Sequence, residues 1–157
     1  MTISEPHSAP RVLVVEDNST NLLVARRMLE IGGFQVDIAT NGRDAVEAAR
    51  DGQFDVILMD VHMPLLDGCE ATREIRQLPG PAGRVPIIAL SASVFAEDRR
   101  RCLQAGADDF IAKPFMAGDL IAKCQLWLNQ RRSQSDGPVE ANGSVPGPKA
   151  TSASQSS

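Results

Sequence analysis

Reactive polar side chains stand where short apolar segments of this sequence end. Glu16 and Asp17 follow the first such segment, Asp60 closes the third, Ser91 follows the fourth and Lys113 follows the fifth. One carboxylate in such a place could be a helix cap. Three carboxylates, a hydroxyl and an ammonium group at four segment ends are better explained by a shared site.

The chemistry of that site follows from its charges. Three carboxylates close together repel one another and raise each other's pKa unless a cation neutralises them. Their hard oxygens suit Mg²⁺, which keeps several waters and commonly binds phosphate oxygens as well. Ser91 would add a hydrogen-bond donor, and Lys113 a positive charge. This set fits a phosphoryl group bound beside a metal, where a carboxylate can act as nucleophile and form an aspartyl phosphate.

The middle of the chain alternates five short apolar runs with helical patterns. Unbroken runs are typical of strands covered on both faces of a parallel sheet, and they lie at 11–15, 36–39, 55–60, 86–90 and 109–112. Helices are predicted at 19–31, 41–52, 67–75, 95–105 and 117–130. The alternation predicts an α/β fold, a five-stranded parallel sheet with right-handed crossovers. Functional sites of such sheets lie beyond the carboxyl ends of the strands, where the polar set stands.

Local signals predict how the helices begin. Ser19 or Thr20 can cap the first helix, whose apolar stripe is expected to include Leu23. Asn41 and Asp67 can cap the second and third helices.

Length and composition set outer limits. The 157 residues carry a net charge of -4, with a pI of about 5.1 and 43% hydrophobic residues, which suits one ordinary domain rather than a general nucleic-acid binder. No apolar run approaches the roughly 18 residues of a membrane span, and residues 1–10 lack the pattern of a secretory signal. Residues 1–10 are expected to be flexible, residues 11–131 to form the domain, and the Ser-, Gly- and Pro-rich residues 132–157 to be disordered.

The three cysteines are Cys69, Cys102 and Cys124. Their odd number and wide spacing fit neither a disulfide framework nor a zinc site, so reduced thiols serving as small apolar side chains are expected. This usage indicates a reducing, cytoplasmic compartment.

The segments VVEDN, LMDVHMPLLDG, ALSAS and FIAKPF, in this order and at these separations, resemble the receiver domain of two-component response regulators. The resemblance covers about residues 10–131. The amino-acid sequence around the first and last of these segments is most similar to receivers of phosphorelays and hybrid histidine kinases. The resemblance implies a flavodoxin-like three-layer sandwich, with the five helices on both faces of the sheet.

The same resemblance implies a role for each acidic residue. Asp60 would be the phosphoacceptor. Asp17 would hold Mg²⁺ directly and Glu16 largely through water, with Asp60 and the backbone carbonyl of His62 as further ligands.

On the response side, the resemblance makes Ser91 the switch hydroxyl and Phe110 the switch aromatic, three residues before Lys113. Lys113 would pair with the phosphoryl oxygens, and the Lys113–Pro114 peptide would be cis. Serine stands where the family more often has threonine. Phenylalanine replaces the common tyrosine, so this side chain lacks a hydroxyl.

Three further positions follow from the resemblance. Pro64 and Gly68 would shape the loop after the third strand, while His62 and Ser93 stand where the family modulates dephosphorylation. Outside the motifs, the run 99–101 of three arginines is expected to be a solvated helix face, with partner docking as the alternative.

The resemblance implies a signalling receiver rather than an enzyme, although it would assist its own phosphorylation and hydrolysis. A sensor histidine kinase or a histidine phosphotransfer protein would donate the phosphoryl group, and output would pass to a partner, with no direct nucleic-acid or membrane binding. One alternative is an aspartate-based phosphatase of the haloacid-dehalogenase kind, but His62 occupies the place of its general acid. A nucleotide- or flavin-binding module is disfavoured because no glycine-rich phosphate loop follows the first strand. The chain could also be a receiver separated from a larger hybrid kinase.

Overall fold

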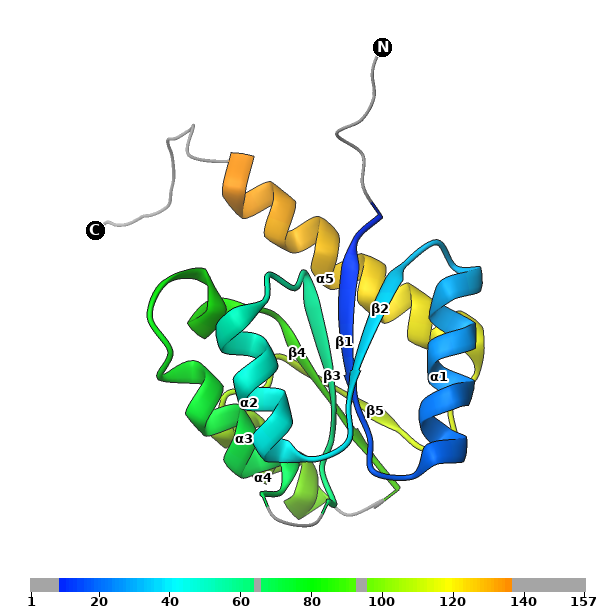
Figure 1. Cartoon of the computed structure of the whole chain (residues 1–157), viewed down its shortest axis with the longest axis horizontal. Helices are drawn as coiled ribbons and strands as arrows, with labels where there is room; N and C mark the ends of the chain where they lie inside the picture. Colours follow the sequence, from blue (N-terminus) through cyan, green and yellow to red (C-terminus); the bar gives the residue numbers. More distant parts are fainter. Residues whose placement is uncertain (1–8, 64–65, 93–95, 137–157) are drawn as a thin grey trace, which may run out of the picture. The chain divides into compact units, whose positions relative to one another are not determined.

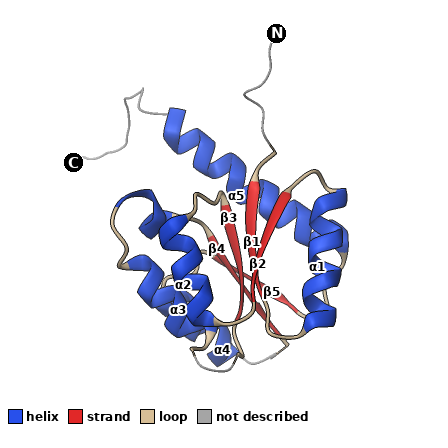
Figure 2. Cartoon of the chain, viewed as in Figure 1, coloured by secondary structure: helices blue, strands red, loops and turns tan. Residues whose placement is uncertain are grey.

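The computed structural model describes residues 9–63, 66–92 and 96–136. Its centre is one five-stranded parallel sheet, as predicted, in the order β2-β1-β3-β4-β5 (Figure 2). The strands are β1 (Arg11–Val15), β2 (Gln35–Ala39), β3 (Val56–Asp60), β4 (Ile87–Ser91) and β5 (Asp109–Ala112). The three inner strands are buried almost throughout, which explains their unbroken apolar sequences, whereas the two edge strands carry exposed positions.

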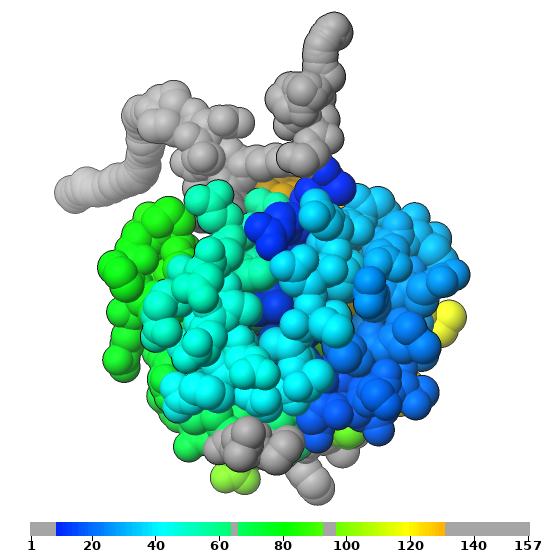
Figure 3. Space-filling view, in the orientation of Figure 1, coloured from blue at the N-terminus to red at the C-terminus, as the bar shows by residue number. Residues whose placement is uncertain are grey.

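The helices join the strands in the predicted α/β alternation. They are α1 (Ser19–Ile31), α2 (Gly42–Asp51), α3 (Gly68–Arg76), α4 (Ala96–Ala105) and α5 (Ala117–Asp136), with a short 3-10 helix at Gly80–Arg84. Right-handed crossovers send α1 to one face of the sheet and α2, α3 and α4 to the other, because the chain reverses direction across the sheet after β2 (Figure 1). Figure 3 looks onto the β2 edge, which α1 and α2 flank.

The core has two halves, because side chains alternate between the faces of a strand. Toward α2, α3 and α4 the strands direct a set of buried side chains, namely Leu13, Val15, Ile57, Met59, Ile87 and Ala89. The alternate positions face α1 and the first turns of α5. The buried residues of these two helices include Leu22, Ala25 and Leu29 of α1 and Leu120 and Cys124 of α5.

Several boundaries differ from the predictions. Asn18, rather than Ser19 or Thr20, caps α1 by accepting from the Asn21 amide, whereas the predicted caps at Asn41 and Asp67 are confirmed. Leu23 does not join the buried stripe: 59% of its surface is exposed, because it lies about 100° around the helix from Leu22.

Helix α5 is longer than predicted. It continues to Asp136 instead of ending near Gln130. The chain divides into two compact units at Cys124, the first holding the whole sheet and the second the later part of α5. Within the described ranges, no helix combines the length and the apolar character needed to cross a membrane.

The loop after β3 closes tightly at Gly68. The Gly68 amide donates to the Val61 carbonyl at 2.9 Å, and a Cβ atom on Gly68 would stand 2.2 Å from the Asp60 carbonyl oxygen. Gly68 therefore fits where no larger residue does, which agrees with the loop-shaping role that the resemblance implies. Its predicted companion, Pro64, lies outside the described residues.

We expect Gly68→Ala to destabilise the protein by about 1–3 kcal/mol, because the backbone of β3 must shift to admit the methyl group. Gly118→Ala is the matched control: nothing lies within 4 Å of a Cβ there. That helical position should be neutral or gain up to about 1 kcal/mol. Urea denaturation of both variants measures the difference, and equal free energies of unfolding would contradict the close approach.

Candidate functional site

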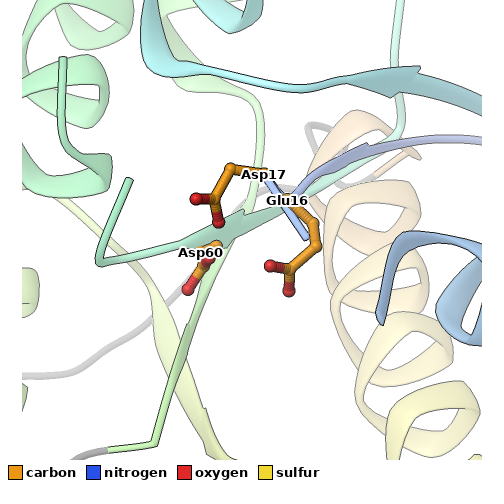
Figure 4. A group of neighbouring side chains, drawn as sticks. All are labelled: Glu16, Asp17 and Asp60. Carbon is orange, nitrogen blue, oxygen red and sulfur yellow. The ribbon is translucent and has the colours of Figure 1, made fainter. Parts of the chain in front are cut away.

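Two strand ends bring the acidic residues together. β1 and β3 are adjacent and parallel, and Val15 is opposite Met59, so the next residues, Glu16 and Asp60, are neighbours. Asp17 follows at once. One carboxylate oxygen from each of Glu16, Asp17 and Asp60 lies within 4.8 Å of the others (Figure 4). The chain leaves β1 toward β2 and returns beyond β1 to β3, so the cluster occupies the switch point at which such sheets hold ligands.

The three carboxylates differ in their contact with water. Glu16 and Asp60 keep only 3% and 4% of their surface exposed, whereas Asp17 is exposed. A cation arriving from solvent would therefore meet Asp17 first and the buried pair behind it. Oxygen ligands from carboxylates in this number suit Mg²⁺, which binds through one or two carboxylates and keeps several waters.

Lys113 supplies the counter-charge. It follows β5, and its Nζ donates to Glu16 Oε1 at 2.8 Å and to Asp60 Oδ1 at 3.1 Å. The peptide between Lys113 and Pro114 is cis, as predicted. Three carboxylates against one ammonium group leave the cluster net negative, which favours a bound cation.

Burial dominates the electrostatics of Asp60. Loss of water raises the pKa of Asp60 from 3.8 to about 6, the charge of Lys113 opposes this rise, and Glu16 adds to it. Burial by itself would lower the pKa of Lys113, but its hydrogen bond to Glu16 and the charge of Asp60 outweigh that effect, so the pKa of Lys113 is raised. The ammonium group therefore stays charged.

Ser91 ends β4, beside β3, and is completely buried. It lies opposite Ala112 in the register, and its carbonyl accepts from the Lys113 amide at 2.8 Å. Ser91 is thus fixed to the residue that carries the ammonium group. Its predicted neighbour, Ser93, lies outside the described residues.

The predicted switch aromatic and His62 lie further out. Phe110 is half-buried in β5, with the Arg99 guanidinium carbon 5.6 Å from its ring centroid. The His62 side chain is exposed, and its Nε2 is 3.6 Å from Asp98 of α4.

Two features of the site were not predicted from the sequence. The arginine run is more than a solvated face, since Arg101 pairs with Asp67 at 3.2 Å. In addition, a cavity of about 350 Å³ opens beside Lys113, lined by Asn21, Val24, Met28, Ala92, Lys113, Pro114 and Phe115. Val24, on the α1 side of this cavity, is 44% exposed. The sequence could not predict the cavity, because it forms only where the fold places α1 beside the segment after β5.

A flavodoxin-like sheet with this acidic cluster and lysine at its switch point defines a receiver-type signalling domain. The chain matches the model of the response regulator receiver domain over residues 12–125. It is 36% identical to the transcriptional regulatory protein PrrA of Mycobacterium tuberculosis over 151 residues, and this alignment covers 91% of this chain and 63% of PrrA. It is 40% identical over 136 residues to sensor histidine kinase GacS of Pseudomonas protegens, covering 85% of this chain and 15% of GacS.

Solved structures agree with the family match. The receiver domain of sensor histidine kinase PA1611 from Pseudomonas aeruginosa superimposes with a TM-score of 0.73 at 44% identity, covering 77% of this chain and 98% of that domain. That crystal structure contains a magnesium ion coordinated in the active-site cleft. Chemotaxis response regulator CheY4 of Vibrio cholerae gives a TM-score of 0.70 at 28% identity, covering 76% of this chain and 98% of CheY4.

This chain belongs to the response regulator receiver domain family of two-component signalling, and it is homologous to the receivers of hybrid histidine kinases. It spans less than two thirds of the length of PrrA and a small part of GacS.

Because the pKa of Asp60 is raised, its charged form is expected to lower the free energy of unfolding, and this effect should depend on pH. The folded value of about 6 exceeds 3.8, so the folded state binds the proton more tightly and stability falls as pH rises from about 4 to 6. We expect Asp60→Asn to be more stable than the parent by about 2–3 kcal/mol at pH 8 without metal, and equally stable below about pH 4. Denaturant unfolding across pH measures this. Asp51→Asn, at an exposed position, is the control, and a difference independent of pH would contradict the assignment.

Proposed function

We propose that Asp60 is the phosphoacceptor of this receiver, taking a phosphoryl group from a phosphohistidine on a sensor histidine kinase or a histidine phosphotransfer protein. The observation that carries the proposal is the cluster of Glu16, Asp17 and Asp60 with Lys113 bonded to two of its members. An Asp60 oxygen forms a bond to phosphorus while the bond from phosphorus to the histidine nitrogen breaks. The chain thus contributes the nucleophile and its charge environment, and assists its own phosphorylation and hydrolysis as a signalling protein rather than an enzyme.

Asp17 and Asp60 would hold Mg²⁺ directly, Glu16 largely through water, and the His62 carbonyl would complete the protein ligands. Mg²⁺ would neutralise charge on the transferring group. The acidic cluster supports this assignment, as does the magnesium ion in the similar receiver of PA1611. Because Lys113 touches both Glu16 and Asp60, it can keep Glu16 while its other hydrogen bond passes from Asp60 to a phosphoryl oxygen.

Ser91 would donate its hydroxyl to the phosphoryl group and so carry the signal to the segment that precedes α4. Its position supports this role, since it ends the strand next to β3 and is tied to Lys113. Phe110 is the proposed aromatic partner of that movement. A shift of this kind selects between arrangements already in equilibrium.

The phosphoryl donor would dock on the rim beside Lys113. Its phosphohistidine must come within bonding distance of Asp60, so its surface must cover the nearest part of this chain. There the 350 Å³ cavity is lined by Val24, which is 44% exposed, and Met116, which is 72% exposed, follows Phe115 of the same lining. Exposed apolar side chains around a reactive centre support a protein donor there.

The phosphatase alternative lacks support at one position. That chemistry calls for an acid two residues after the nucleophile, where His62 stands with its imidazole 3.6 Å from Asp98. The relatives include both a transcriptional regulatory protein and a sensor histidine kinase, which supports partner output and onward phosphotransfer alike.

Acetyl phosphate with Mg²⁺ should add a labile group of about 80 Da, one phosphoryl, to the parent protein. Asp60→Asn should gain no labile adduct, because it removes the nucleophile. Intact-mass spectrometry before and after mild base measures both. Asp51→Asn should label like the parent, and equal labelling of Asp60→Asn would overturn the proposal.

Mg²⁺ should stabilise the parent, by about 2.7 kcal/mol at a hundred times its Kd. Asp17→Asn should fold as the parent does, because Asp17 is exposed and its substitution removes nothing from the core. It should lose most of the stabilisation by Mg²⁺, because it removes a proposed metal ligand. Thermal unfolding with and without MgCl₂ measures the shift. A full magnesium response in Asp17→Asn would place the metal elsewhere.

A further inference from the structure

Two buried thiols face each other between α3 and α4. Cys69 Sγ and Cys102 Sγ are 3.7 Å apart, and each residue keeps 2% of its surface exposed. They are 33 positions apart in the sequence and belong to different helices. A disulfide has a sulfur–sulfur distance of about 2.05 Å, so a closure of less than about 2 Å would join them.

The surroundings permit that closure. With Gly68 and Thr72, the thiols line a gap too small to hold a water molecule, so no ordered water has to leave. Cys69 is the second residue of α3, whose capping box joins Asp67 and Glu70. Arg101 brings a positive charge to Asp67, the cap itself, at 3.2 Å.

These neighbours distinguish the two sulfurs. A hydrogen bond with Cys102 lowers the pKa of Cys69 to about 7, against the effect of burial and with help from the charge of Arg101. The same hydrogen bond and burial raise the pKa of Cys102. A thiolate at a helix N-terminus is the more reactive form, so Cys69 is the attacking sulfur. Burial raises the pKa of Cys124 to about 12, which leaves it inert.

We propose that Cys69 and Cys102 form a redox modification site, at which a hydroperoxide such as hydrogen peroxide converts the two thiols to a disulfide. The Cys69 thiolate attacks one peroxide oxygen, the O–O bond breaks, and a sulfenic acid and hydroxide form. The Cys102 sulfur then attacks the Cys69 sulfur, and the hydroxyl leaves as water with the thiol proton. Both sulfurs are oxidised by one electron each and the peroxide is reduced to two waters.

The disulfide would act on the element that responds to phosphorylation, a consequence that rests on the proposed function. Among the side chains described in α4, those of residues 97–105, only Cys102 and Ala105 are buried. A helix held by so few buried groups opens and shifts easily, which also admits a small oxidant. A bond from Cys102 to α3 would fix α4 in one position and hold back its response to Asp60.

Thiol counting tests the site itself. The reduced protein has three thiols, and after peroxide the denatured parent should retain one, with peptide mapping linking Cys69 to Cys102. Cys124→Ser is the matched control, an equally buried cysteine given the same substitution, and should still lose two thiols. Cys102→Ser, whose hydroxyl keeps a hydrogen-bond donor beside Cys69, should form no disulfide and leave Cys69 as a sulfenic acid that dimedone captures. Three surviving thiols in the parent, or a bond to Cys124 or between chains, would overturn the proposal.

Amide hydrogen exchange tests the consequence. Acetyl phosphate with Mg²⁺ should change exchange in α4 of the reduced protein, and this change should be absent or at least halved in the oxidised protein. An equal change in both forms would refute the restraint by the disulfide. Failure of the proposed function is distinguishable, because no phosphoryl adduct would then form in either state while the thiol count would be unaffected.

Discussion

Two carboxylates buried at the end of the sheet depend on one ammonium group. Removing a charged carboxylate from water costs several kcal/mol unless a partner compensates, and Glu16 and Asp60 are both almost fully covered. Lys113 offsets part of this cost for both, although it lies 97 residues from one and 53 from the other along the chain. The parallel sheet in the order β2-β1-β3-β4-β5 places the ends of β1, β3 and β5 within reach of one lysine side chain.

The end of β3 at Asp60 contacts α3, and α3 in turn contacts α4. The Asp60 carbonyl borders Gly68, whose amide bonds to Val61, so α3 begins directly against the site. Asp67, which caps α3, pairs with Arg101 of α4. Contacts of a few ångströms therefore connect Asp60 to the first turn of α3, and that turn to α4.

The sequence was sufficient to predict the sheet and the convergence of Glu16 and Asp60, because both follow from unbroken apolar runs and the rule for carboxyl ends. Their roles in chemistry stay predictions. The cap at Asn18 was missed by one residue, since Ser19 and Thr20 are equally suited to capping. The approach of Cys69 to Cys102 could not be foreseen, because it depends on how α3 and α4 pack, and odd, widely spaced cysteines indicate isolated thiols.

The sheet and α4 differ in how much buried apolar surface holds them in place, so they differ in the free energy needed to move them. The inner strands are buried on both faces, so moving them would expose large apolar side chains at a cost of several kcal/mol. Among the side chains described in helix α4, only Cys102 and Ala105 are buried, and a partly exposed ion pair such as that of Arg101 with Asp67 contributes at most about 1 kcal/mol. Helix α4 can therefore move at a smaller cost in free energy than the strands that hold Asp60.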